Sequence, residues 1–279
     1  DSKIYWYENN GASDPSWASS GIGNTQGTPW SIYVADLDKD GDLDIISSGT
    51  TSWDKISWWE NDGASDPSWS ASDFATSGNG RWMISVADLD VDGDNDVIYT
   101  SYGGDFIALS KNDGASDPAW SSSTIISNVD GVDEVIIADL NSDGKMDLVS
   151  RAADSDKIAW HENDGASNPS WNSIEISSTN SNPYDIGVAD MDNDGDLDVV
   201  SALASTIVWY ENTMDKGRVA GWTPTTITTQ AVEPSDVFAV DLDNDGDIDI
   251  VSAEIDPVAS QSEVRWYNNN GSQDFTMGF

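Results

Sequence analysis

The sequence predicts an all-β protein made of repeated units of four antiparallel strands, and three observations support this prediction. An acidic stretch of nine residues recurs five times, beginning at positions 36, 88, 139, 190 and 241, so the spacing is 52 residues once and 51 residues three times. Each unit holds four short runs of strand-forming residues bounded by Gly, Asn, Asp and Pro. No segment shows ten residues of helical periodicity. Four strands at a fixed period near 51 residues predict a β-propeller of four-stranded blades.

The repeat that contains the first acidic stretch shows the order of elements that we expect in each blade. Its first strand is the apolar run at residues 31–37, which ends at the acidic stretch, and its second strand begins directly after that stretch, at residues 44–48. The third strand is the segment KISWWEN at residues 55–61, and relatives of it recur along the chain. We expect the Trp at the middle of this strand, such as Trp58 and Trp209, to lie in the core between blades. The fourth strand has a weaker strand pattern and is rich in Ser and Thr, as at residues 122–127 of the next repeat. The acidic stretch therefore lies in the hairpin between the first two strands of a blade.

The acidic stretch has the composition of a loop that binds a hard cation. Oxygen-bearing side chains occupy positions 1, 3, 5 and 9, and glycine occupies position 6, where the backbone needs freedom to turn. Alternate side chains of such a tight turn converge on one point, and oxygen ligands suit Ca²⁺. Acidic turns that only stay hydrated are the alternative, but they do not explain five copies in register. The sequence therefore predicts metal sites.

The stretch is not an EF-hand loop, because no helices flank it and position 12 is Ser or Tyr in place of Glu. With its pattern D-x-D-x-D-G-x-x-D between two strands, the chain resembles the FG-GAP repeats of integrin α-subunit propellers. It also resembles the related VCBS-type repeats of bacterial surface proteins and the calcium-containing propeller lectins. The resemblance covers essentially the whole chain. It implies about five Ca²⁺ ions, each held between the first two strands of a blade.

The resemblance also implies the ligands of each ion. The side-chain ligands, at positions 1, 3, 5 and 9, are Asp36, Asp38, Asp40 and Asp44; Asp88, Asp90, Asp92 and Asp96; Asp139, Asn141, Asp143 and Asp147; Asp190, Asp192, Asp194 and Asp198; and Asp241, Asp243, Asp245 and Asp249. The residues at position 7, which offer a backbone carbonyl, are Asp42, Asp94, Lys145, Asp196 and Asp247. Because Asn141 replaces Asp and Lys145 lies nearby, we expect the third site to be the weakest.

Charge and composition narrow the possible partners and location. The formal net charge is −40, and five Ca²⁺ ions would reduce it only to −30, so the surface repels nucleic acid and anionic membranes. There is no cysteine, and we see no signal peptide or membrane-spanning run. Exposed carboxylate loops are commonly filled by extracellular calcium. We therefore expect a secreted or cell-surface protein without membrane insertion, with Asp1 as a mature or excised start.

The two ends of the chain leave the number of blades open. Residues 3–24 read as the third and fourth strands of a blade without its first two, so we expect an N-terminal half-blade. The chain thus carries five acidic loops but six copies of the third strand. We expect residues 1–279 to form a single propeller domain. Either one blade is a half-blade, or the ring is larger and the chain is a fragment of a longer protein.

Comparison of the repeats separates a constant face from a variable one. The loop between strands three and four is nearly constant, with NDGASDPSW at residues 61–69 as an example, and we expect its recurring Trp to be a packing residue. Stacking of that Trp on a glycan is the alternative. The loops between strands two and three, and between successive blades, differ in every unit, which is typical of a binding surface. We call these the divergent loops.

The divergent loops supply the candidate ligand-binding residues, which are Trp30, Trp53, Arg81, Trp82, Tyr102, Arg151 and Tyr184. Aromatic rings offer apolar faces to sugar C–H groups, and Arg can hold a carboxylate through two hydrogen bonds. For Trp30 and Trp82 a role in capping the core is an equal alternative. We expect a glycan or another cell-surface ligand, with the oligomeric state left open.

Enzyme chemistry has little support in the sequence. The single histidine, His161, occupies a slot that holds Tyr, Trp or Ser in the other units, so we expect a strand surface position there. No cysteine nucleophile and no histidine metal cluster is present. We therefore predict a calcium-stabilised propeller for binding or adhesion that is not an enzyme. The alternatives are a structural spacer of a large surface adhesin, and a polysaccharide lyase that uses Tyr and Arg.

Overall fold

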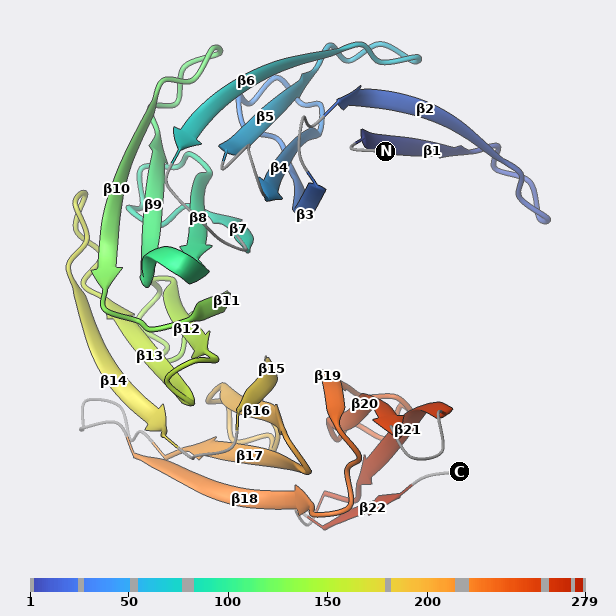
Figure 1. Cartoon of the computed structure of the whole chain (residues 1–279), viewed down its shortest axis with the longest axis vertical. Helices are drawn as coiled ribbons and strands as arrows, with labels where there is room; N and C mark the ends of the chain where they lie inside the picture. The colour runs from blue at the N-terminus through green and yellow to red at the C-terminus, as the bar shows by residue number, and fades with distance from the viewer. Residues whose placement is uncertain are drawn as a thin grey trace. The chain divides into compact units, whose positions relative to one another are not determined.

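A computed structural model describes residues 3–24, 28–50, 55–76, 83–178, 182–213, 221–256, 261–271 and 274–277. In this part of the chain, 22 strands form six antiparallel sheets, one of two strands and five of four (Figure 1). The described residues include no helix long and apolar enough to cross a membrane. Two compact units, residues 1–133 and 134–279, are described separately below, and the single domain stays a prediction.

The first unit contains one two-stranded sheet and two four-stranded sheets. The two-stranded sheet, which is the expected half-blade, pairs β1 (Lys3–Asn9) with β2 (Trp17–Asn24). The four-stranded sheets are β3 (Thr28–Ala35), β4 (Asp44–Thr50), β5 (Lys55–Asn61) and β6 (Trp69–Thr76), followed by β7 (Ile84–Ala87), β8 (Asp96–Ser101), β9 (Phe106–Asn112) and β10 (Trp120–Ser127). A short 3₁₀ turn, η1 (Tyr102–Gly104), joins β8 to β9. Strand order in each sheet follows the chain.

The second unit contains three four-stranded sheets with the same order, and β11 begins two residues before the unit boundary. They are β11 (Val132–Ala138), β12 (Asp147–Ala152), β13 (Lys157–Asn163) and β14 (Trp171–Ser177); β15 (Pro183–Ala189), β16 (Asp198–Leu203), β17 (Thr206–Asn212) and β18 (Trp222–Thr228); and β19 (Pro234–Val240), β20 (Asp249–Asp256), β21 (Gln261–Asn269) and β22 (Phe275–Met277). Each acidic loop joins the first and second strands of its sheet, as the sequence predicted.

The hydrophobic core lies between consecutive sheets of each unit. Trp58 in the middle of β5 packs with Val97 and Tyr99 of the next sheet, and Trp209 of β17 packs with Val237 and Ile250 of the next sheet. Alternation along the third strand turns these side chains to one face. Trp58 and Trp209, each at the middle of a third strand, are therefore core residues, as expected.

The Trp at the start of the fourth strand packs on the preceding sheet. Trp120 of β10 stacks on Phe74 of β6, with ring centroids 4.5 Å apart, and Trp69 joins a cluster with Ile4 of β1. Trp17 is 58% exposed, so the expectation of a packing role is wrong for this residue. Its sheet is the first of the unit, and within the described residues no earlier sheet is available to cover the ring.

Candidate metal loops and a polar cavity

The five acidic loops share one backbone conformation. The residue at position 4 has a left-handed backbone in every loop, with φ between 54° and 61°, and the glycine at position 6 has φ between 86° and 98°. The carboxylate at position 1 accepts the N–H groups that this turn exposes. In the second loop, Asp88 Oδ1 accepts from the N–H of Asp92 at 3.1 Å and Asp88 Oδ2 from that of Gly93 at 2.9 Å. The turn thus fixes the side chain at position 1.

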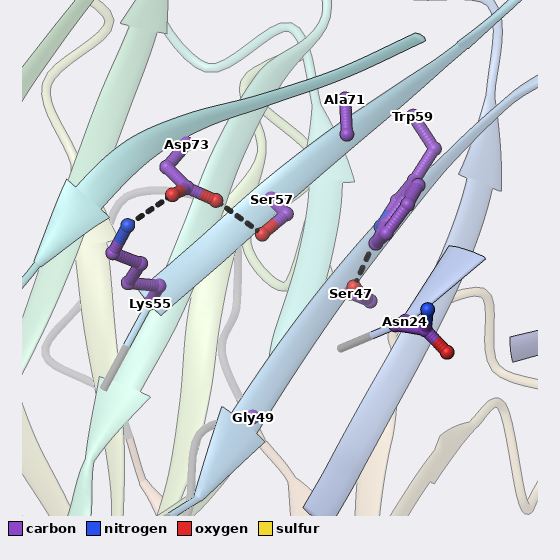
Figure 2. Close-up of a pocket in the computed structure, with 8 residues that line it drawn as sticks. All are labelled: Asn24, Ser47, Gly49, Lys55, Ser57, Trp59, Ala71 and Asp73. Carbon is purple, nitrogen blue, oxygen red and sulfur yellow. Dashed lines mark hydrogen bonds and ion pairs between the residues drawn. The ribbon is translucent and has the colours of Figure 1, made fainter. Parts of the chain in front are cut away.

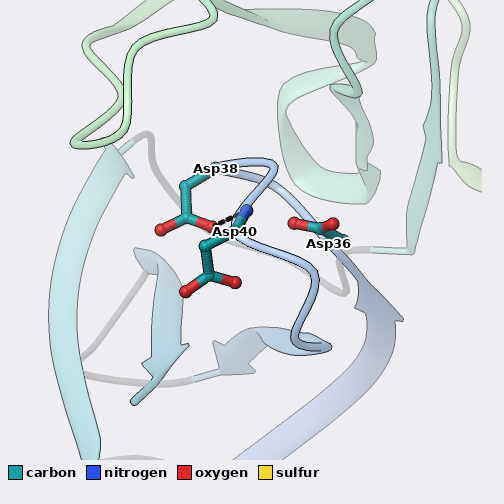
Figure 3. A group of neighbouring side chains, drawn as sticks. All are labelled: Asp36, Asp38 and Asp40. Carbon is teal, nitrogen blue, oxygen red and sulfur yellow. Dashed lines mark hydrogen bonds between the residues drawn. The ribbon is translucent and has the colours of Figure 1, made fainter. Parts of the chain in front are cut away.

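Positions 3 and 5 are held in the same way by backbone N–H groups two residues ahead. In the first loop, Asp38 Oδ1 accepts from the N–H of Asp40 at 3.2 Å, and Asp40 Oδ1 from that of Asp42 at 2.9 Å. Figure 3 shows Asp36, Asp38 and Asp40 gathered at one end of this loop. Each of these hydrogen bonds uses one oxygen of a carboxylate, which leaves the other available for a cation.

The structure brings three carboxylates together in four of the five loops. Within each group, the ligand atoms all lie within 4.8 Å of one another. The groups found among the described residues are Asp36, Asp38 and Asp40; Asp88, Asp90 and Asp96; Asp190, Asp192 and Asp194; and Asp241, Asp243 and Asp249. The third loop has Asn141 in place of an acid, and the expectation that it binds most weakly stays a prediction. The position 7 carbonyl ligands also stay predictions.

The Asp at position 9 has a structural task that the sequence did not reveal. Asp96 is fully buried, and its Oδ1 accepts from the N–H of Asn112 at 2.9 Å while its Oδ2 accepts from that of Leu89 at 3.3 Å. Asp44, Asp198 and Asp249 make the same pair of bonds. This Asp therefore joins the start of its own loop to the end of the third strand.

Burial makes the charged form of the position 9 carboxyl costly. It raises the pKa of Asp96 and of Asp198 to about 7, and that of Asp147 to about 6, because the desolvation outweighs the backbone hydrogen bonds. Neighbouring carboxylates raise the pKa further; Asp90 does so for Asp96. A bound cation would favour the ionised form of these groups.

The donor set fits a hard divalent cation. Among the described residues, Asp36 Oδ1 in the first loop and Asp90 Oδ1 in the second are buried oxygens without a hydrogen-bond partner. A buried carboxylate oxygen without a partner is costly unless a cation or donor faces it. The donors are oxygens only, which suits Ca²⁺ better than a metal that prefers sulfur or nitrogen.

The Asn that ends the third strand links consecutive acidic loops. Asn112 Nδ2 donates to Leu37 O, in the acidic loop of the preceding sheet, at 2.7 Å, and also to Asn95 O in its own loop at 3.3 Å. In the second unit, Asn212 donates to Leu140 O at 2.9 Å and Asn269 donates to Met191 O at 3.1 Å. The constant Asn at the end of each third strand was the sequence signal for this contact.

A polar cavity of about 220 Å³ lies in the first unit, between the half-blade and the sheet β3–β6 (Figure 2). Its lining residues are Asn24, Ser47, Gly49, Lys55, Ser57, Trp59, Ala71 and Asp73. The Lys55 ammonium pairs with Asp73, and Ser57 Oγ donates to Asp73 Oδ1 at 2.7 Å. Trp59 Nε1 donates to Ser47 Oγ at 2.9 Å. Asn24 ends β2 and Lys55 begins β5, so the cavity lies where divergent loops leave the sheets.

The residues predicted to bind a ligand are not tested by this geometry. Trp53, Arg81 and Trp82 lie outside the described residues. Trp30 on β3 is 49% exposed and Tyr184 on β15 is 39% exposed, while Tyr102 lies in η1 and is partly buried. All seven assignments stay predictions. Sequence reasoning missed the cavity residues, for which the one signal was Lys55, a rare basic residue beside a divergent loop.

Arg151 is held by contacts within the second unit. Its Nε lies 3.0 Å from a carboxylate oxygen of Glu134, and its Nη1 donates to Pro183 O at 2.8 Å. These contacts join β12 to β11 and to the start of β15. They give the guanidinium a structural role, whatever else it binds.

His161 is buried, so the expectation of a strand surface position is wrong. Its Nε2 lies 2.8 Å from Ser150 Oγ and its Nδ1 lies 2.7 Å from Ser173 Oγ. Burial lowers its pKa to about 4. The slot accepts different side chains because each polar end finds a local partner; Trp59, for example, binds Ser47 and Tyr267 binds Glu254.

These features can be compared with known proteins. The sequence pattern of the FG-GAP-like repeat matches residues 1–47, 88–150, 139–201 and 190–252. The chain belongs to the FG-GAP-like repeat family. No curated protein matches this FG-GAP-like chain.

Solved structures with a similar fold include propeller lectins. A lectin of Agrocybe aegerita, described as recognising non-reducing terminal N-acetylglucosamine, is similar over 99% of this chain and 73% of its own, with a TM-score of 0.67 and 18% identity. The Aleuria aurantia lectin, described as a six-bladed β-propeller with a novel fucose recognition mode, is similar over 94% of this chain and 83% of its own, with a TM-score of 0.50 and 13% identity.

A third similar structure is the Vibrio cholerae biofilm matrix protein Bap1, with a TM-score of 0.51 and 16% identity over 90% of this chain. The chain spans only 38% of the length of Bap1. At these identities the similarity shows the fold alone. Together with the repeat family, it confirms the predicted fold class, a β-propeller of four-stranded antiparallel blades with an N-terminal half-blade.

Proposed function

We propose that this FG-GAP-like chain is a calcium-stabilised propeller that binds glycans outside the cell. The observation that carries the proposal is the polar cavity of the first unit, which lies beside divergent loops and has an indole in its wall. The lectins with a similar fold add support, because they are described as recognising N-acetylglucosamine and fucose. A role in adhesion follows if the glycan belongs to a surface.

The cavity has the groups that a sugar needs. Sugar hydroxyls both donate and accept hydrogen bonds, and the cavity offers the Asp73 carboxylate and the Ser57 hydroxyl oxygen as acceptors, with the Lys55 ammonium as donor. Its volume lies below the roughly 300–1,000 Å³ of pockets for drug-sized ligands, which suits one small polar ring. Trp59 is mostly buried and bonded to Ser47, so its indole is a fixed wall.

Calcium has a structural part in this proposal. The side chains at positions 1, 3, 5 and 9 would hold the ion, and the ion would supply the positive charge that the clustered carboxylates lack. Because Asp at position 9 also binds the end of the third strand, filling the loop would stabilise three strands of a blade together. Extracellular calcium is high enough to fill such loops, which supports a location outside the cell.

A glycan array with calcium present tests the binding proposal. We expect the protein to retain a defined set of glycans, and Asp73→Asn to weaken retention at least tenfold with little change in melting temperature. The matched control is Glu175→Gln, which changes an equivalent exposed pair, Lys157 and Glu175 at 3.8 Å, on β13 and β14. Equal retention by wild type and Asp73→Asn would contradict the cavity assignment.

The same experiment separates the other candidate functions. No retention on the array would favour a structural spacer. Incubation with acidic polysaccharides that yields new unsaturated product would favour a lyase. Either outcome would contradict a module that only binds glycans.

A further inference from the structure

The residue before the Asn that ends the third strand lies beside position 3 of the acidic loop. We call it the flanking residue, and in the five sheets with acidic loops it is Glu60, Lys111, Glu162, Glu211 and Asn268. Three contacts show the proximity. Lys111 Nζ lies 2.6 Å from Asp90 Oδ2, Asn268 Nδ2 donates to Asp243 Oδ2 at 2.7 Å, and Asn141 Nδ2 lies 3.5 Å from Glu162 Oε1. The side chain is therefore within reach of the ion site.

The second loop differs from the others in the charge placed beside it. The Lys111 ammonium forms an ion pair with Asp90, a residue that is only 6% exposed. Lys39, from the loop of the preceding sheet, forms a second ion pair with this loop, at Asp94. The chain has only 11 basic residues, and two of them contact this loop. Asp90 Oδ1 still has no hydrogen-bond partner within the described part of the chain, which leaves it available for a further ligand.

The first and fourth loops provide matched comparisons. Like the second, each has Asp at positions 1, 3, 5 and 9. Their flanking residues are Glu60 and Glu211, and each acts electrostatically on the Asp at position 3, Asp38 or Asp192. Between these loops and the second, the flanking charge changes from −1 to +1 while the four side-chain ligands stay the same.

We propose that the flanking residue sets the calcium affinity of each loop, and that Lys111 makes the second loop bind calcium more weakly than the first and the fourth. This inference rests on the proposal that the loops bind calcium. An ammonium beside position 3 repels the incoming ion and must give up its contact with Asp90, whereas a Glu carboxylate attracts the ion. In the third loop, Glu162 adds a carboxylate next to Asn141.

Two reciprocal variants test the inference through thermal melts in calcium and in excess chelator. Lys111→Glu removes the ion pair with Asp90, so we expect a lower melting temperature in chelator and a larger rise on adding calcium. Glu211→Lys gives the fourth loop an ammonium, so we expect a higher melting temperature in chelator and a smaller rise. Lys111→Met, which removes the charge and keeps the length, should fall between wild type and Lys111→Glu.

Crystals equilibrated at limiting calcium give the result for each loop separately. In the wild type we expect a lower calcium occupancy in the second loop than in the first and fourth loops. We expect Lys111→Glu to lower the dissociation constant of the second loop for calcium by about tenfold or more. If Lys111→Glu does not fold, the fourth loop of Glu211→Lys carries the test alone.

Three outcomes are distinguishable. A wild-type melting temperature that does not change when chelator is added contradicts the calcium proposal itself. If calcium raises the melting temperature of the wild type and of both variants by the same amount, only the role of the flanking residue is contradicted. Opposite changes in the two reciprocal variants support it.

Discussion

Asn112 joins two sheets of the first unit through one hydrogen bond, from its Nδ2 to the carbonyl oxygen of Leu37 at 2.7 Å. Its backbone N–H binds Asp96 at 2.9 Å, and its Oδ1 accepts from Gly114 N–H at 2.9 Å. One side chain thus connects its own acidic loop, the loop of the preceding sheet and the next turn. If calcium fills the loops, as we propose, this contact would couple each loop to its neighbour.

Replacement of Asn112 by Ala should destabilise the protein by roughly 2–3 kcal/mol, because one buried and one partly buried carbonyl group lose their donor. Asn9 is the matched control. It holds the same turn, with Gly11 N–H 2.9 Å from its Oδ1, but it is exposed and ends the half-blade. Denaturant unfolding of both variants measures the difference, and equal losses would show that the link between loops contributes nothing.

Replacement of Trp120 by Ala should destabilise the protein by roughly 2–3 kcal/mol, somewhat less than a fully buried aromatic ring, because the ring stacks on Phe74 but stays partly exposed. Trp17→Ala, at the same repeat position on an exposed ring, should stay within about 0.5 kcal/mol of wild type. Thermal or urea unfolding distinguishes them. A large loss from Trp17→Ala would mean that something covers this ring.

His161 should make stability depend on pH below neutrality. Its pKa is about 4 in the folded protein and about 6.5 when unfolded, so the unfolded chain binds the proton first. Its contribution is therefore full above pH 6.5 and is lost as the pH falls toward 4, by roughly 3 kcal/mol in total. His161→Gln removes this titration and keeps the carboxylates. Unfolding curves of the two proteins should diverge between pH 6.5 and 4; parallel curves would refute a neutral buried imidazole.

Trp53→Ala and Arg81→Ala should weaken glycan retention while changing the melting temperature by only about a degree or two, since surface substitutions cost little stability. Both residues belong to divergent loops, and Trp53 lies in the loop that ends at Lys55, which lines the cavity. Array binding and melts of each variant measure the two effects. Full retention by both variants would contradict a role of these two residues in glycan binding and would leave the cavity alone as the proposed site.

Much of the fold was predictable because the repeat carries the information five times over. The strand order, the half-blade at residues 3–24 and the place of each acidic loop follow from spacing and strand composition. Trp58 and Trp209 were expected in the core because they recur in the middle of a third strand. Trp17 has the same local sequence as Trp69, and only the position of its sheet in the unit leaves it exposed.

The parts that could not be predicted depend on contacts between distant residues. The ion pair of Lys111 with Asp90 joins the third strand of a sheet to the acidic loop of the same sheet, and neither segment alone predicts it. The burial of His161 depends on Ser150 and Ser173 in the neighbouring strands. The cavity likewise needs β2, β4, β5 and β6 together, so Asp73 gave no sign of its position from sequence.

The most direct test of the central claim, that calcium in the acidic loops stabilises this propeller, is the melting temperature of the whole chain with and without excess chelator. A ligand that binds only the folded state contributes about 2.7 kcal/mol per site at a concentration 100 times its dissociation constant, so removal from several loops should lower the melting temperature by many degrees. Readdition of calcium should restore it. An unchanged melting curve in excess chelator would contradict the account.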